Sequence, residues 1–434
     1  MWVIGKKCYI CLFNNNSFIT MKEIKNSKAI FSLALGINNP WYLETIEFIE
    51  VEGNPIKELH IHINFHRGST FTSPDGSPSK CYDTEEKVWR HLDFFQHKCY
   101  LHARVPRIKD GSGNIRQVIV PWARTGSGFT LLFEAYSMFL IEGEMPVNNV
   151  ANTLKVAAHR LWRVFNYWLE TAKSKDDLSE VSEIGIDETS VKKGHKYITI
   201  VADMVERRVI NAQAGKDSKI FDKFAEQLEQ KGGNRNNIKQ ICIDMSHAYI
   251  AGARATFPNG QITFDKFHIV QHLNIAMDTV RKEERKGNDL LKGHKYTFLR
   301  SNKTLSNKKR NELDYLNTLY PTLGSAYRLK EIFLDIFSIK KPKQAIYYLE
   351  VWCNTALVSG IQPFIDFVKL IKRHWVGVTN YFYSRLTNGI LEGINSKIQL
   401  AKRRARGYRN IKNFINMILF TCGKLKFDYP YKTT

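Results

Sequence analysis

Hydrophobic and polar residues alternate with a period of two over residues 59–65, which is typical of a half-buried β-strand. Similar runs recur further along the chain, separated by turns rich in glycine, serine and proline, at 87–94, 98–105 and 117–120. We therefore predict a small β-rich module over residues 59–121. Residues 1–58 combine short apolar runs with polar turns, and the sequence assigns them no role.

The hydrophobic period becomes helical after this module, and residues 129–141 are predicted to form one apolar helix. Pro146 favours the first turn of a second helix, and a third helix carries Arg160 and Arg163. Two short helices joined by a tight turn predict a helix-turn-helix DNA-binding domain over residues 122–175, in which these arginines would contact DNA. An ordinary α-hairpin is the alternative interpretation.

Short buried strands and amphipathic helices alternate from residue 184 onward. The strands are predicted at 184–187, 197–202, 209–212, 238–244 and 261–265, and the helices at 217–230 and from 246. The order β-β-β-α-β-α-β, with a carboxylate at the ends of the first and fourth strands, is that of a ribonuclease H-like α/β sheet. Residues 266–383 are almost entirely helical, so we predict a core in two parts, 184–265 and 384–434, with a helical insertion between them.

The carboxylates at those strand ends are the candidate catalytic residues. Asp187 and Asp244 would lie side by side if the first and fourth strands were neighbours, and Glu392 would supply a third carboxylate from a helix. Phosphodiester chemistry with two metal ions requires several carboxylates at one site, and Mg²⁺ prefers carboxylate oxygens and water. A single aspartate at a strand end is more often a turn or cap residue, two at matching positions leave that interpretation and a metal site about even, and the motif around Glu392 favours the metal site.

The helix that carries Glu392 is predicted to be amphipathic. Its buried stripe would consist of Ile390, Ile394 and Ile398, four residues apart. Its polar stripe would hold Glu392 together with Asn395, Gln399 and Arg403.

Asp265 and His268 follow the fifth predicted strand. They are candidates for an auxiliary metal or phosphate contact, or for a base that positions water. A helix N-cap and a packed histidine are the alternative interpretation. His195 and Lys196 are expected to touch DNA or solvent.

The net charge indicates a polyanionic partner. Lysine and arginine exceed aspartate and glutamate by 22, and residues 281–310 and 397–426 contribute +8 and +9 of this excess. The second stretch contains Tyr408, whose ring could stack on an unpaired base, and the predicted DNA contacts Lys402, Arg403, Arg404, Arg406 and Arg409. A membrane is the weaker alternative, because no apolar run approaches the roughly 18 residues that span a bilayer. The seven cysteines are spread thinly, which favours a reducing cytoplasm over a disulfide scaffold.

Six short motifs occur in order along the chain. They are Gly185-Ile186-Asp187-Glu188, Lys193-Gly194-His195-Lys196-Tyr197, Asp244-Met245-Ser246 with Tyr249, Asp265-Lys266-Phe267-His268, Asn388-Gly389-Ile390-Leu391-Glu392-Gly393-Ile394-Asn395, and Arg403-Arg404-Ala405-Arg406-Gly407-Tyr408-Arg409-Asn410. Together they resemble the ISL-three family of bacterial insertion-sequence transposases of the DDE type. The resemblance implies a ribonuclease H-like core, a catalytic triad of Asp187, Asp244 and Glu392, and a helical insertion before the third member. The expected cofactor is a pair of Mg²⁺ ions, which Mn²⁺ can replace.

The β-rich module departs from this family pattern. Family members carry paired Cys-Pro-x-Cys-Gly zinc knuckles there, whereas the corresponding turns, 73–77 and 109–113, lack cysteine. Serine and aspartate are poor structural zinc ligands, so no zinc is expected. The remaining cysteines and histidines lack the spacing of a knuckle: Cys81, Cys99, His91 and His97, with a single Cys-x-x-Cys pair at Cys8 and Cys11.

The sequence therefore predicts a DNA transposase that binds the terminal inverted repeats of an insertion sequence and catalyses Mg-dependent strand cleavage and strand transfer. It would act on double-stranded DNA, as a homodimer or higher homo-oligomer, at the bacterial nucleoid. Two alternatives stay open. One is a catalytically retired, transposase-derived DNA-binding protein, which the missing knuckle cysteines favour. The other is a structure-specific nuclease on the same fold, which would cut strands without joining them.

Overall fold

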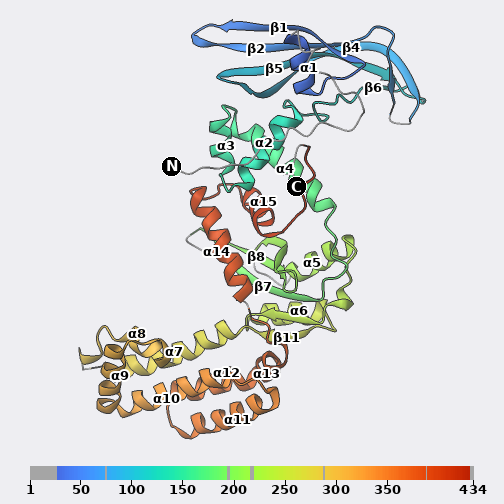
Figure 1. The fold of residues 1–434 in the computed structure, drawn as a ribbon. Coiled ribbons are helices and arrows are strands. Elements are labelled where there is room, and N and C mark those ends of the chain that lie inside the picture. The colour runs from blue at the N-terminus through green and yellow to red at the C-terminus, as the bar shows by residue number, and fades with distance from the viewer. Residues whose placement is uncertain are drawn as a thin grey trace. The chain divides into compact units, whose positions relative to one another are not determined.

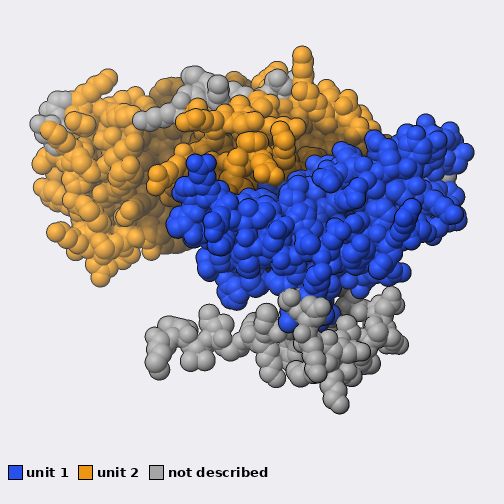
Figure 2. All heavy atoms as spheres, turned by 90° about the horizontal axis from the view of Figure 1, so that it is seen from above, with its two compact units in different colours: residues 1–143, 428–434 blue, residues 144–427 orange. Residues whose placement is uncertain are grey.

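The computed structural model describes residues 27–73, 76–192, 196–215, 219–286, 289–387 and 389–430. The chain divides into two compact units, coloured separately in Figure 2: unit 1 (residues 1–143 and 428–434) and unit 2 (residues 144–427). Among the described helices, none is long and apolar enough to cross a membrane.

Unit 1 is built on a six-stranded sheet with the order β1-β2-β5-β4-β3, in which β6 pairs with β5. The strands are β1 (Trp41–Val51), β2 (Asn54–Phe65), β3 (Thr70–Thr72), β4 (Pro78–Phe94), β5 (His97–Lys109) and β6 (Ile115–Gln117). The unit also contains helices α1 (Ser27–Leu35) and α2 (Leu131–Glu142). The pair β2–β5 is parallel and the other pairs are antiparallel.

This sheet begins earlier than the sequence pattern predicts. The expected boundary at residue 59 falls inside β2, and β1 lies wholly within the segment 1–58. β1 is an edge strand, and its second half is almost fully exposed. Its sequence therefore lacks the alternation of apolar and polar residues from which a half-buried strand is predicted. Its first residue, Trp41, is buried against Trp122, with ring centroids 5.0 Å apart.

Two helices joined by a tight turn open unit 2. α3 (Val147–Thr153) begins after Pro146, as predicted, and α4 (Ala158–Ser174) is the helix that carries Arg160 and Arg163. The predicted domain 122–175 crosses the boundary between the units, because α2 belongs to unit 1.

Helix α15 (Ile411–Cys422) packs against α4. The amide of Asn416 donates a hydrogen bond to Asn166 Oδ1 at 2.9 Å, and the rings of Phe165 and Phe420 lie 5.1 Å apart. α4 therefore packs against the end of the chain.

A five-stranded sheet forms the centre of unit 2, with the order β11-β10-β7-β8-β9. Its strands are β7 (Glu183–Lys192), β8 (Lys196–Asp203), β9 (Arg208–Ala214), β10 (Gln240–Ile243) and β11 (Gln261–Phe264), and its helices are α5 (Lys219–Gln230) and α6 (His247–Thr256). β7, β10 and β11 run parallel, whereas β8 is antiparallel to both of its neighbours. The element order is the predicted one, and the chain folds as a mixed α/β structure (Figure 1).

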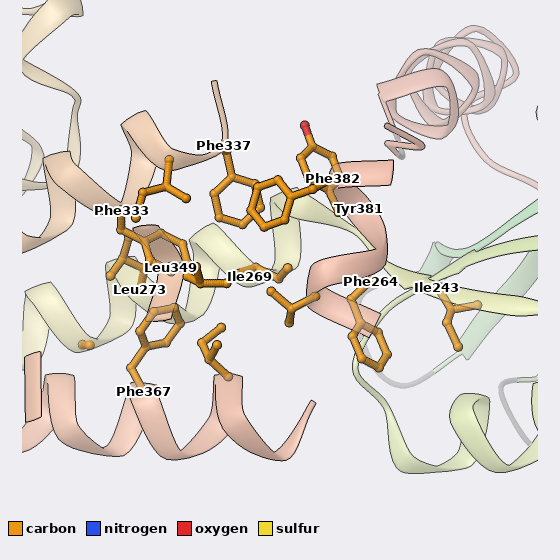
Figure 3. Packing of buried hydrophobic residues seen from close by; sticks show 14 of the residues in the cluster. Ile243, Phe264, Ile269, Leu273, Phe333, Phe337, Leu349, Phe367, Tyr381 and Phe382 are labelled. Carbon is orange, nitrogen blue, oxygen red and sulfur yellow. The ribbon is translucent and has the colours of Figure 1, made fainter. Parts of the chain in front are cut away.

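In the described part of the predicted helical stretch 266–383, the structure has seven α-helices. They are α7 (Lys266–Glu284), α8 (Lys295–Leu299), α9 (Asn307–Leu319), α10 (Pro321–Ile336), α11 (Pro342–Val358), α12 (Gln362–Arg373) and α13 (Trp375–Ser384). Short 3-10 helices lie at Arg235–Asn237, Asp289–Leu291 and Asn302–Thr304. The helices share one continuous core with the sheet, because Ile243 and Phe264 of the strands and Ile269 and Phe333 of the helices belong to the same buried cluster (Figure 3). α14 (Gly389–Arg404) then returns to the sheet.

Candidate active site

β10 and β11 end at the same edge of the unit 2 sheet, whereas the parallel strand β7 continues past Asp187 to Lys192. The prediction that the first strand ends on Asp187 is therefore wrong, because β7 stays paired with β8 beyond it. β10 pairs with β7 on one side and β11 on the other, and Cys242 lies opposite Gly185 of β7. Two residues further along, the two registers place Asp244 between Asp187 and Asp265. The first and fourth predicted strands are therefore neighbours, and the sheet brings a third carboxylate to this edge.

The carboxylate of Asp187 lies in a partly buried position. Burial raises its pKa to about 6, and the carboxylates of Asp265 and Glu188 act in the same direction. The backbone N–H of Glu188 donates to Oδ1 at 2.8 Å and, together with His268, opposes that rise in pKa. Because burial disfavours the charged form of Asp187, a cation at this position would stabilise it.

Asp265 and His268 both lie close enough to Asp187 to act on it electrostatically. Asp265 is buried at the N-cap position of α7, yet its side chain makes no capping hydrogen bond to the helix. The N-cap interpretation therefore does not account for this carboxylate.

The polar stripe of α14 runs along β7. Asn395 Nδ2 donates to Asp187 Oδ2 at 2.8 Å, and Gln399 Nε2 donates to Thr189 Oγ1 at 2.9 Å. One turn further, Lys402 Nζ donates to the backbone carbonyl of Ser190 at 2.9 Å. α14 and β7 therefore contact each other at successive turns of the helix. Lys402, which was predicted to contact DNA, donates to a backbone carbonyl of β7.

The buried stripe of α14 differs from the prediction. Leu391, Ile394 and Ile398 are buried, whereas Ile390 is only half-buried. Leu391 lies over Gly185 of β7, where a Cβ atom on the glycine would come within 2.9 Å of Leu391 Cδ1. The missing side chain at Gly185 therefore allows α14 to approach the strand that carries Asp187.

Glu392 is exposed, one helical turn before Asn395. Its carboxylate is on the stripe of α14 that reaches Asp187, but it is not packed into the sheet. Within the described residues, no three His, Cys, Asp or Glu side chains are grouped closely enough to hold a metal ion. The strand registers place Asp187, Asp244 and Asp265 at adjacent backbone positions of one sheet edge, but the structure does not gather their side chains with that of Glu392 into one cluster.

Tyr249 links α6 to this edge, a role that sequence reasoning did not assign. Its hydroxyl donates to Glu188 Oε1 at 3.1 Å and lies 3.0 Å from Thr199 Oγ1. Burial raises the pKa of Tyr249, so the hydroxyl keeps its proton and holds the carboxylate that follows Asp187. Its position inside a family-like motif, five residues after Asp244, was the available signal.

The predicted DNA-binding arginines differ in their surroundings. Arg163 on α4 is exposed and Arg160 is half-buried. Arg403, Arg406 and Arg409 are exposed, whereas Arg404 forms an ion pair with Glu144. His195 lies outside the described residues, as does the side chain of Lys196.

The cysteines and histidines of unit 1 make separate contacts. Burial raises the pKa of Cys99 to about 12, and Cys81 Sγ lies 3.1 Å from the backbone carbonyl of Asp83. His91 Nδ1 lies 2.8 Å from Thr130 Oγ1, and His97 Nδ1 lies 2.7 Å from the Lys57 carbonyl. Cys8 and Cys11 lie outside the described residues. The expected absence of zinc stays a prediction.

Comparison with known proteins gives consistent results along the chain. A family model described as a transposase matches residues 184–418, and one described as the helix-turn-helix domain of transposase family ISL3 matches residues 118–169. The chain is 26% identical over 432 residues to the transposase for insertion sequence element IS1557 of two Mycobacterium tuberculosis strains, covering 90% of this chain and 95% of that protein. It is also 26% identical over 387 residues to the transposase for insertion sequence element IS1001 of Bordetella parapertussis, covering 86% and 94%.

Proposed function

Because the chain belongs to the transposase family ISL3, we propose that it excises and inserts an insertion sequence through a DDE active site on a ribonuclease H-like core. Asp187, Asp244 and Glu392 would be the catalytic triad. The observation that carries this proposal is the parallel register of β7 and β10, which makes Asp187 and Asp244 neighbours at one sheet edge.

These carboxylates fit a divalent metal. Hard oxygen ligands are those that Mg²⁺ prefers, and a cation beside Asp187 would offset the burial that raises the pKa of this carboxylate. Asp187, Asp244 and Glu392 would hold two Mg²⁺ ions, with Mn²⁺ as a substitute and Asp265 as an auxiliary group. Bound there, the metal would activate water or a 3′-hydroxyl and stabilise the leaving oxygen.

The surrounding residues would orient these ligands. Asn395 donates to Oδ2 of Asp187, and the backbone N–H of Glu188 donates to Oδ1, so each carboxylate oxygen is held by one hydrogen bond. The Tyr249 hydroxyl donates to Oε1 of Glu188 and holds that carboxylate by one hydrogen bond. Outer contacts of this kind set the direction in which a ligand oxygen points. His268, next to Asp187, would contact phosphate or position water.

DNA would be held by two sets of cations. Arg160 and Arg163 on α4 would contact the terminal inverted repeats, because the second helix of a helix-turn-helix enters the major groove. Arg403, Arg406 and Arg409 would contact phosphates independently of sequence. Two element ends must be joined, so the active complex would contain at least two copies of the chain.

The test is incubation of the purified protein with labelled element ends, with and without Mg²⁺. Metal-dependent cleavage followed by joining to a target duplex supports the transposase. Cleavage without joining supports a nuclease, and specific binding without cleavage supports a retired DNA-binding protein.

A further inference from the structure

A pocket of about 880 Å³ opens at the far end of α14, away from the acidic edge of the sheet. Its walls come from α3, α4, the end of β7, the turn after α14 and the first turn of α15. All of these elements belong to unit 2. Pockets of about 300–1,000 Å³ are those that enclose small molecules or single chemical groups of a larger one.

The lining of this pocket is strongly basic. Lys192, Arg404, Arg406 and Arg409 line it, and the lining contains no aspartate or glutamate. Arg404 is paired with Glu144, but within the described residues Arg406 and Arg409 form no ion pair. Arg406 is also held in the left-handed backbone region, at φ 53°, which costs a non-glycine residue about 1–2 kcal/mol. This conformation belongs to the turn that ends α14, where the backbone N–H groups of Arg406 and Gly407 donate to the carbonyls of Arg403 and Lys402.

Two aromatic rings stand among these cations. Trp162 and Tyr408 lie 6.5 Å apart, with their planes at 76°. Trp162 Nε1 donates to Asn148 Oδ1 at 3.0 Å, and Tyr408 stacks on Phe414 at 4.9 Å. Both rings are therefore fixed before any ligand arrives, so stacking on them would require little ordering of side chains.

Free amides complete the pocket. Asn410 uses its side chain to cap α15, and Asn148 holds Trp162. The side chains of Asn149 and Asn413 make no hydrogen bond to any described residue. Asparagine amides both donate and accept, which suits the hydrogen-bonding edge of a nucleobase.

We propose that this pocket holds one unpaired nucleotide of DNA. Arg406, Arg409 and Lys192 would contact its phosphate, Trp162 would stack on its base, and Asn149 and Asn413 would reach the base edge. A paired base would not present this edge, and a duplex is too wide to enter a pocket closed by helices on several sides.

The structure also sets where this nucleotide lies. From Glu392 to Arg404, α14 extends about 18 Å at about 1.5 Å per residue. From Asp187 to Lys192, β7 extends about 17 Å at about 3.3 Å per residue. At about 3.4 Å per nucleotide along a strand, both paths place the unpaired nucleotide about five nucleotides from the scissile bond. This position, unlike the pocket itself, rests on the proposed function of the acidic edge.

The experiment measures binding of the full-length protein to two labelled duplexes by fluorescence anisotropy. One duplex is fully paired, and the other has the same sequence with a single unpaired nucleotide. The protein is expected to bind the second duplex more tightly. Trp162→Ala should remove that preference, a change of about 5- to 160-fold from the loss of one base–aromatic stack, and leave binding to the paired duplex within two-fold.

Asn149→Ala repeats the test at an exposed position where folding is not at risk. Lys412→Ala is the matched control, because Lys412 is exposed on the same turn of α15 but outside the pocket. It should weaken binding to both duplexes equally. Equal affinity of the unchanged protein for both duplexes, or an equal loss on both in the Trp162 and Asn149 variants, would overturn the proposal. Cleavage is not required, so Asp187→Asn protein can be used, and a failure here is separate from a failure of the proposed chemistry.

A second measurement locates the nucleotide. Duplexes with the single unpaired nucleotide at successive positions near the element end should bind most tightly when it lies about five nucleotides from the cut. Equal affinity at every position would overturn this placement.

Discussion

Gly185→Ala tests whether the contact between β7 and α14 positions the active site. The added Cβ would lie 2.9 Å from Leu391 Cδ1, whereas an optimal carbon–carbon contact is about 3.5 Å or longer. Met204 Sδ would lie closer still to the added Cβ, and this buried but unbranched side chain would have to change rotamer. Leu391 is buried in a helix, so relief of the contact requires α14 to shift by about 0.6 Å.

Two effects follow from this shift. Overpacking of a buried contact should lower the free energy of unfolding by about 1–3 kcal/mol. The shift also moves Glu392 and Asn395, which lies 2.8 Å from Asp187, away from the strand. Because misplacement by about 1 Å costs about 100-fold in rate, a shift of half that size should reduce cleavage on the order of ten-fold.

The assays are urea denaturation and cleavage of a labelled element end under conditions where the variant is folded. Gly393→Ala is the matched control, since a Cβ there meets no atom within 4 Å and alanine favours a helix by about 0.5–1 kcal/mol. It should raise stability. If Gly185→Ala unfolds at the same urea concentration as the unchanged protein and cleaves at the same rate, α14 does not rest on β7 at this point.

Four further outcomes are expected. Asp187→Asn, Asp244→Asn and Glu392→Gln should each abolish cleavage and leave DNA binding within a few-fold, because they keep size and remove metal ligands; near-normal cleavage by any one would remove that residue from the triad. Purified protein should contain no stoichiometric zinc and chelation should leave unit 1 folded, whereas about one zinc per chain in elemental analysis would point to Cys81, Cys99, His91 and His97. Alanine at Arg403, Arg404, Arg406 and Arg409 together should reduce the slope of log K for DNA binding against log salt concentration by about 3, since Arg404 is already paired with Glu144. An unchanged slope would show that these four residues do not contact phosphates. Alanine at Arg160 and Arg163 should instead reduce the discrimination between element-end DNA and random DNA. Burial lowers the pKa of His91 and His102 from 6.5 to about 4, so these side chains bind protons more weakly in the folded form than in the unfolded form. Unit 1 should therefore lose stability as the pH falls from about 6.5 towards 4. A free energy of unfolding, measured by urea denaturation, that is constant over this window would contradict the assignment.

The sequence was sufficient to predict the elements that carry the aspartates. The apolar runs before Asp187 and Asp244 are strands, as the local pattern predicts, but only the strand before Asp244 ends there, because β7 continues to Lys192. The predicted order β-β-β-α-β-α-β is the one observed, and the pairing of β7 with β10 meets the condition under which the two aspartates would be neighbours.

The remaining features of the site depend on contacts between residues that are distant along the chain. A helical pattern allows spacings of both three and four residues, so it did not distinguish Ile390 from Leu391 on the buried face of α14. That choice is made by Gly185, about 200 residues earlier. Similarly, composition identifies Lys402 as one cation among many, and only the fold shows that its ammonium is held by the carbonyl of Ser190.

The packing of α15 on α4 and of α14 on β7 has a consequence for the order of synthesis. The helix that would read DNA and the strand that carries Asp187 both leave the ribosome well before residues 389–422, which supply their packing partners. A nascent chain therefore lacks the packing partners of α4 and β7 until residues 389–422 have been made. Premature termination anywhere before α14 would yield a product in which both elements expose the surfaces that α14 and α15 cover, and such a product is expected to be less stable than the full chain.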